Sequence, residues 1–360
     1  MKSSEIKVAV VAGATRGAGR GIARALGEAG SVVYCTGRSV AGSPSPYDRP
    51  ETIEETAALV TAAGGVGVPV RVDHTDEAQV AALFGRVARE HGRLDVLADN
   101  VAGSDMRMAG WTSAWETELK DGAAILENAL LSHVITAKHA APLMIKRRRG
   151  LIAQVTEFDL LFCGGNVLAQ LVKFSLKGLA LTLAEELRKH GVASVAITPG
   201  YLRSELMLEH FKVTEENWRD AGKRDKNFLH SESPLFVGRA VVALARDPKV
   251  LARTGEMTSS YELAREYGFT DYDGSRPDFG RHFAEKGFLR GPLRRHLEWL
   301  ERLTRRTRLY MGEERIDATH AGQTDDEPRA AGQRRAKRGG RKAGAKAEAG
   351  AEVGAGAVSV

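Results

Sequence analysis

The sequence predicts an α/β fold built on a doubly wound parallel sheet. Short apolar runs alternate with longer helical patterns from residue 6 to about residue 200. A glycine-rich turn, with Gly13, Gly17 and Gly19, joins the first apolar run to the first helical pattern. Parallel strands connected by helices cross over in the right-handed sense, which places helices on both faces of the sheet.

The apolar runs predict strands at residues 7–11, 31–35, 67–72, 94–98, 151–155 and 193–197. Periodic apolar residues between them predict helices at residues 20–29, 51–63, 77–91, 123–148 and 170–190. After Pro199-Gly200, further helices are expected at 202–211 and 234–245. We interpret residues 202 to about 232 as a lid over the substrate. Its Leu206, Met207, Phe211 and Trp218 indicate a pocket that accepts apolar groups.

The chain of 360 residues, 43% of them hydrophobic, is predicted to form one domain over residues 1–283. An arginine-rich helical extension is expected at 284–318, with its helix at 287–310, followed by a basic Ala/Gly-rich tail at 319–360. The run 329–346 carries eight Lys and Arg residues and no acid, so the net charge of +6 belongs largely to this stretch. The tail's composition predicts disorder, and it lacks aromatic residues for base stacking, so no nucleic-acid partner is expected.

The cellular setting predicted from the sequence is the cytoplasm. No segment approaches the ~20 apolar residues of a membrane helix, and the N-terminus does not read as a signal peptide. Cys35 and Cys163 are the only cysteines, and their spacing matches no metal site. We therefore expect neither a membrane partner nor a metal.

The glycine-rich turn predicts a phosphate site. A glycine turn lets backbone N–H groups approach a phosphate, and the following helix directs the positive end of its dipole at the anion. We expect Gly13, Thr15, Gly17 and Gly19 to hold the phosphates of a dinucleotide.

The end of the second strand favours NADP(H) over NAD(H). An acidic residue there would bind a ribose diol, but this chain has Gly37 followed by Arg38. A guanidinium at that place suits a ribose 2′-phosphate, and Arg16 in the turn supplies a second positive charge. Alternatively, Arg38 is an ordinary exposed arginine. The proline-rich loop at 41–50 is expected to line the edge of this site.

Several motifs in this order resemble the short-chain dehydrogenase/reductase family, over residues 6 to about 280. They are the glycine turn, Asp73 after the third strand, Asn100 in the run 95–103 and the turn Pro199-Gly200. Asp99 stands where the family has a first asparagine. The run 202–211 looks like one bacterial branch of largely uncharacterised substrate. The resemblance implies a Rossmann fold, with Asp73 near the adenine and Pro199-Gly200 against the nicotinamide.

The resemblance also implies hydride transfer between the nicotinamide and a carbonyl or alcohol. In the family, a tyrosine moves the proton, and a lysine four residues later lowers the tyrosine's pKa and holds the ribose. Lys173 occupies the lysine position, but Ala169 occupies the tyrosine position. No tyrosine lies between Tyr47 and Tyr201.

The family's two other catalytic positions also differ. The serine position falls on Glu157, with Thr156 beside it, and the supporting asparagine falls near Ala129, with Asn128 one place away. The catalytic set predicted for this chain is therefore Lys173, Glu157 and Thr156.

Three functions remain open. In the first, the protein is an oxidoreductase of unknown substrate whose substitute acid is one of Glu157, Thr156, Asp159, His133 and Tyr201. In the second, it binds NADP(H) without turnover and acts as a sensor or partner subunit. In the third, the site serves a dehydration or an isomerisation. The resemblance further implies a homodimer or homotetramer, built on the helices at 123–148 and 170–190.

Overall fold

The computed structural model describes residues 5–43, 49–102, 113–117, 119, 122–157 and 167–285. The chain divides into two units, Met1–Arg302 and Leu303–Val360, and all described residues belong to the first. The helix predicted at 287–310, the tail, Asp159 and Cys163 lie outside the described residues. The domain boundary at residue 283 stays a prediction.

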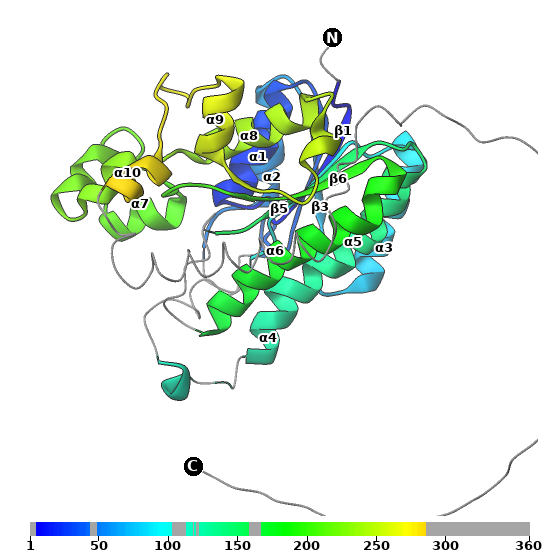
Figure 1. Ribbon diagram of the computed structural model, residues 1–360, viewed down its shortest axis with the longest axis horizontal. Coiled ribbons are helices and arrows are strands. Elements are labelled where there is room, and N and C mark those ends of the chain that lie inside the picture. Colours follow the sequence, from blue (N-terminus) through cyan, green and yellow to red (C-terminus); the bar gives the residue numbers. More distant parts are fainter. Residues whose placement is uncertain are drawn as a thin grey trace, which may run out of the picture. The chain divides into compact units, whose positions relative to one another are not determined.

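The predicted α/β fold is confirmed. Seven parallel strands form one sheet in the order β3-β2-β1-β4-β5-β6-β7 (Figure 1). The strands are β1 (Val8–Ala12), β2 (Val32–Gly37), β3 (Val66–Arg71), β4 (Val96–Asp99), β5 (Gly150–Val155), β6 (Val192–Thr198) and β7 (Met257–Ser259). The chain order reverses between β1 and β4, and the carboxyl ends of such neighbouring strands form the crevice where open α/β sheets bind ligands.

Helices cover both faces of the sheet. Helices α1, α2 and α8 pack together on one face, and α3, α5 and α6 pack together on the other (Figure 1). Their bounds are α1 (Gly17–Glu28), α2 (Ile53–Ala62), α3 (Glu77–His91), α5 (Ser132–Ile145), α6 (Val167–Leu187) and α8 (Pro234–Arg246). The shorter helices are α4 (Gly122–Leu126), α7 (Glu205–Phe211), α9 (Ser260–Tyr267) and α10 (Phe279–Glu285).

The central strands β1, β4, β5 and β6 are buried throughout and mostly apolar because both of their faces are covered. All five residues of β1 are buried. Val8 and Val10 join the core beneath α3 and α5, whereas Ala9 and Val11 join the core beneath α1 and α8. This alternation fixes the register of β1, so that Gly13 emerges at the edge of the sheet beside the end of β4.

Strand β7 and helices α9 and α10 were not predicted, and one predicted helix is interrupted. Strand β7 was missed because its three residues include Thr258 and Ser259 and carry no apolar pattern. The helix predicted at 123–148 is interrupted by a π-helical turn at Glu127–Leu131. Ser132 donates its hydroxyl to the Asn128 carbonyl at 2.7 Å, and such side-chain bonds compete with the helical ladder.

The lid predicted at 202–232 has a small core of its own. Phe211, Trp218 and Phe228 are buried there with Ala221. The Arg203 guanidinium lies over the Trp218 ring, 4.2 Å from its centre. The expectation that Phe211 and Trp218 face the substrate pocket is therefore wrong, because both rings pack against Phe228 inside the lid.

One helix among the described residues satisfies the length and composition of a membrane span. It is α6 with the turn that follows, Val167–His190, of mean hydropathy 1.5. The sequence analysis expected no such segment. The helix packs on β5 and β6, and a helix that covers a buried sheet needs a similarly apolar composition.

Candidate functional site

A cavity of about 1090 Å³ opens at the carboxyl edge of the sheet. It is lined by the ends of β1, β2, β5 and β6, the start of α1, the lid and α10. The predicted site residues that line it are Gly13, Thr15, Arg16, Gly17, Arg38, Asp73, Asn100, Thr156, Glu157, Lys173, Pro199 and Gly200. Gly19 does not line it. The structure thus brings together residues up to 187 positions apart in the sequence, from Gly13 to Gly200.

The glycine turn is held against the end of β4 by close backbone contacts. Gly13 has φ +74°, and a Cβ on it would lie 2.4 Å from the Asn100 carbonyl oxygen. A Cβ on Gly19 would lie 2.1 Å from the Gly13 oxygen, so this glycine serves packing behind the turn. Asn100 Nδ2 donates to the Gly13 oxygen at 3.2 Å. Asn100 therefore holds the shape of the turn.

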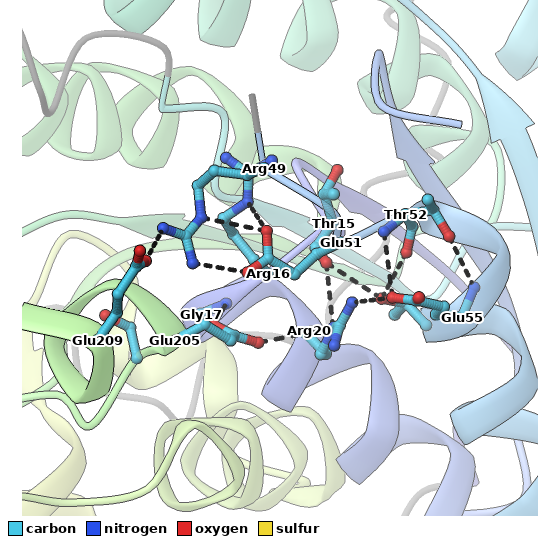
Figure 2. Close-up of polar contacts among 12 residues, drawn as sticks. Thr15, Arg16, Gly17, Arg20, Arg49, Glu51, Thr52, Glu55, Glu205 and Glu209 are labelled. Atoms are coloured by element: carbon cyan, nitrogen blue, oxygen red, sulfur yellow. Dashed lines mark hydrogen bonds and ion pairs between the residues drawn. The ribbon is translucent and has the colours of Figure 1, made fainter. Parts of the chain in front are cut away.

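The N-terminus of α1 already binds a carboxylate. The Gly17 N–H donates to Glu205 Oε2 at 2.7 Å, and Arg20 Nε lies 3.7 Å from Glu205 Oε1 (Figure 2). Glu205 is the first residue of α7 in the lid. A helix N-terminus that binds this carboxylate has the donor and the dipole that a phosphate needs.

Two arginines beside the turn share one glutamate. Arg49 donates to both oxygens of Glu51, at 2.7 and 3.1 Å, and to Glu209 at 2.6 Å (Figure 2). Arg16 Nε lies 3.2 Å from Glu51 Oε2, but the N–H does not point at this oxygen, so Nε has no hydrogen-bond partner among the described residues. Burial lowers the pKa of Arg16 despite Glu51. The buried Arg16 donor is thus suitably placed for an anionic ligand.

Sequence reasoning did not single out Arg49, Glu51 or Glu205. Arg49 and Glu205 line the cavity. The signal for Arg49 was the loop at 41–50, which was expected at this edge. Nothing in the sequence pairs Glu205 with Gly17, since the two are 188 residues apart.

On the other side of the turn, Arg38 lies near two polar groups. Its guanidinium is 3.7 Å from Asp73 Oδ2 and 3.3 Å from Asn128 Oδ1. Burial alone would raise the pKa of Asp73, but hydrogen bonds from Thr75 and the charge of Arg38 hold it below its usual value. Asn128 and Ala129, which belong to the π-helical turn, both line the cavity.

His133 does not reach the cavity. Its side chain is fully buried, with Nε2 2.9 Å from the Val101 carbonyl oxygen and Nδ1 2.6 Å from Gln154 Oε1. Asp99 lies 3.4 Å from Nδ1, and burial raises the pKa of Asp99 to about 6 although His133 opposes the shift. His133 is therefore a core residue, and its candidacy as the substitute acid is wrong.

Tyr201 lines the cavity, but its hydroxyl points elsewhere. The hydroxyl donates to Asp225 Oδ2 at 3.2 Å, and the ring packs edge-on against Phe228 and Phe279. Burial, together with Asp225, raises the pKa of Tyr201 to about 12. These contacts make Tyr201 a poor proton donor to a substrate.

The opposite end of the cavity carries an ion pair. Lys173 Nζ, on α6, lies 2.6 Å from Glu157 Oε2, just beyond the end of β5. Thr156 Oγ1 is buried and has no hydrogen-bond partner among the described residues. Ala169, one helical turn before Lys173, is 5% exposed and does not line the cavity. Lys173, Glu157 and Thr156 therefore form one polar cluster, and their catalytic roles stay predictions.

Within the described residues, no group of three or more His, Cys, Asp or Glu side chains could hold a metal ion. Cys35 is buried, and burial raises the pKa of its thiol to about 12.

Known proteins resemble this chain over most of its length. Residues 7–214 match the family model described as short chain dehydrogenase. "Dehydrogenase/reductase SDR family member 1" of Mus musculus is 37% identical over 74% of this chain and 84% of its own length. "7alpha-hydroxysteroid dehydrogenase" of Clostridium sardiniense is 28% identical, over 69% and 89%.

A solved structure supports the fold. A short chain dehydrogenase from Mycobacterium thermoresistibile superposes with a TM-score of 0.62 and 22% identity, and covers 76% of this chain and 91% of that one. Members of the matched family are oxidoreductases that use NAD or NADP. With a family model over more than half of its residues and a relative at 37% identity, the chain belongs to the short-chain dehydrogenase/reductase family.

Proposed function

We propose that the protein is an NADP(H)-dependent oxidoreductase that transfers a hydride to or from a small molecule in an atypical site. The observation that carries this proposal is that one cavity holds both sets of groups that a dinucleotide needs. It has the glycine turn and two arginines on one side and the Lys173–Glu157 pair on another. A dinucleotide needs both a phosphate cradle and a ribose-binding group near the reacting carbon.

The residues of the cavity fit such a cofactor. The start of α1 would hold the pyrophosphate, where Gly17 now binds a carboxylate. Arg38 and Arg16 would hold a 2′-phosphate, and Asp73 would lie near the adenine. When bound, the nicotinamide would supply or accept the hydride.

The remaining chemistry falls to the chain's own side chains. The Thr156 hydroxyl, buried without a partner among the described residues, can donate to a substrate. Lys173 can hold the nicotinamide ribose, and its ion pair with Glu157 fixes both groups at the cavity wall. Leu206 and Met207 of the lid line the same cavity and would exclude water from it.

A second candidate is an NADP(H)-binding protein without turnover. Ala169 favours it, because this buried methyl group stands where the resemblance expects the proton-transferring tyrosine. The two functions differ in one measurement: nucleotide binding and turnover must be followed on the same preparation.

The experiment pairs a fluorescence titration with NADPH and NADH with a turnover screen at 340 nm. The oxidoreductase predicts binding and turnover, whereas the sensor predicts binding alone. For the sensor, Ala169→Tyr should create ketone reductase activity. Ala169→Phe is the matched control, because it adds the same ring without a hydroxyl. Failure to bind either nucleotide would contradict both functions.

We also propose a homodimer or homotetramer in the cytoplasm. Leu131 and Val134, near the start of α5, and Leu171 and Leu181, on α6, are exposed apolar residues on the two helices that the resemblance assigns to the subunit interface. Light scattering coupled to gel filtration measures the subunit number, and a monomer at micromolar concentration would contradict the proposal.

A further inference from the structure

The reacting end of the cavity contains a carboxylate where the family's chemistry calls for hydroxyl groups. Glu157 Oε2 contacts Lys173 Nζ at 2.6 Å, while 58% of the Glu157 side chain is exposed. An ion pair with an ammonium needs the carboxylate form of its partner. Glu157 therefore meets a substrate as a hydrogen-bond acceptor with negative charge.

Such a group does not suit the reduction of a ketone. Hydride addition to a C=O bond leaves an alkoxide, which requires a proton from a nearby donor. Ala169 supplies none, Tyr201 donates to Asp225, and the Lys173 ammonium is held in its ion pair with Glu157. The Thr156 hydroxyl can donate a hydrogen bond, but an aliphatic alcohol is too weak an acid to give up its proton. A carboxylate beside a developing alkoxide would also repel it.

The same group suits a cationic C=N bond. Hydride addition to an iminium carbon forms one C–H bond and converts the C=N π pair into the nitrogen lone pair. The products are an amine and an oxidised nicotinamide, and this step consumes no proton. A substrate of this class removes the need for the missing tyrosine.

The cavity has the groups that bind an organic cation. A carboxylate has lone pairs for about four contacts, so Glu157 can accept from a second cation while it contacts Lys173. The aromatic residues that line the same cavity are Tyr201, Tyr261, Phe279 and Phe283. Aromatic faces attract cations, and the Arg265 guanidinium already lies over the Tyr261 ring, 5.8 Å from its centre.

We propose that the substrate is an iminium ion or protonated imine, or the corresponding amine in the reverse direction, with Glu157 as its counter-ion. This inference rests on the proposed hydride transfer and names its substrate class. Thr156 then contacts the substrate as a hydrogen-bonding neighbour, not as the source of an essential proton.

The first experiment measures binding without cofactor. N-methyl-3,4-dihydroisoquinolinium is permanently cationic, and 1-tetralone is a neutral ketone of similar size. By calorimetry, the cation should bind at least about tenfold more tightly than the ketone, a difference of about 1.4 kcal/mol. Glu157→Gln should remove this preference and leave the ketone's Kd unchanged. Glu185→Gln, an exposed carboxylate on α6, is the matched control and should change neither.

The second experiment adds NADPH and follows the same two probes at 340 nm. The inference predicts a kcat/KM at least about 100-fold higher for the iminium, and a raised KM in Glu157→Gln. A ketone reduced as well as the iminium would overturn the inference while the proposed function stands. If Tyr261→Phe then abolished the ketone activity, a relocated phenol would explain it. Bound NADPH with neither probe reduced would contradict hydride transfer itself, and equal Kd values for both probes would contradict the role of Glu157.

Discussion

The side of the cavity where we propose that the phosphates bind (the phosphate-binding side) and the side where we propose that the substrate reacts (the reacting side) are built from different parts of the chain. The phosphate-binding side consists largely of backbone: the glycine turn, the first N–H groups of α1 and the end of β4. The reacting side consists of side chains, above all Lys173, Glu157 and Thr156, on β5 and α6.

This difference explains why one side follows the family pattern and the other departs from it. A backbone cradle needs glycine where a Cβ would collide, so a change there costs the shape of the turn. A side-chain site changes its chemistry with one substitution and leaves the fold intact. The family's fold and cofactor class therefore transfer to this chain more directly than its proton chemistry does.

The largest expected effect is on the backbone side. Gly13→Ala would place a Cβ 2.4 Å from the Asn100 oxygen at φ +74°. We expect a loss of about 3 kcal/mol in the free energy of unfolding from overpacking and strain, and no measurable NADPH binding. Gly30→Ala is the control, since Gly30 has φ +79° but nothing within 4 Å of a Cβ. It should cost only about 1 kcal/mol in urea unfolding. Equal losses would show that the close contact is unimportant.

The next effect concerns cofactor choice. Arg38→Asp should raise the Kd for NADPH about 100-fold and that for NADH less than about threefold, because only NADPH has a 2′-phosphate to repel. Fluorescence titrations with both nucleotides measure this. Arg71→Asp, at an exposed arginine outside the cavity lining, should change neither Kd. The same change in both Kd values after Arg38→Asp would remove the reason to prefer NADP(H).

A buried acid that contacts Gly200 and Ser260 should make stability depend on pH. Glu232 Oε2 accepts from the Gly200 N–H at 2.9 Å and from the Ser260 hydroxyl at 2.6 Å. Burial raises the pKa of Glu232 to about 8. Between its unfolded pKa of about 4.3 and pH 8 the folded state holds one more proton, so stability falls as pH rises through this range.

Glu232→Gln removes the titrating carboxyl group and should flatten the dependence of stability on pH. The free energy of urea unfolding is measured at pH 6 and pH 8.5. Between these two pH values it should fall in the wild type by more than about 1 kcal/mol beyond any change in the variant. Glu262→Gln changes an exposed helix-capping acid nearby and should keep the wild-type slope. A slope that is the same in wild type and Glu232→Gln would show that Glu232 is ionised in the folded protein.

The smallest effect tests the contact between the lid and the start of α1. The Glu205 carboxylate accepts a hydrogen bond from the Gly17 N–H, which we propose binds the pyrophosphate when the cofactor is present. Glu205→Gln should lower the Kd of NADPH and NADH by the same factor of about 3 to 10, because a competing negative charge is removed. Glu209→Gln, which loses only the contact with Arg49, should have little effect. Weaker nucleotide binding in Glu205→Gln would show that the carboxylate supports the cofactor.

Much of the fold was predictable because burial leaves a local record. Strands β1, β5 and β6 are buried along their whole length and mostly apolar, and α3 was predicted with its observed bounds, Glu77–His91. Asp76 caps that helix by accepting from Ala78 and Gln79. Strand β7 left no such record, since its place is decided by pairing with β6.

The candidate site was predictable only in part. Gly13, Arg38, Asp73, Asn100 and Lys173 follow strand ends or helix positions that the pattern locates. Burial separated two of the candidates for the substitute acid: His133 proved to be a core residue and Glu157 a cavity residue. Neither outcome is written in the neighbouring sequence.

The sequence by itself determined the alternation of strands and helices and the glycine turn, because both depend on local periodicity and on the absence of Cβ atoms. Only the tertiary structure decided that Glu205 contacts Gly17, that Tyr201 turns to Asp225 and that Glu157 meets Lys173. These contacts join segments 16 to 188 residues apart, and the direction of a side chain across such a distance depends on how the whole sheet and its helices pack.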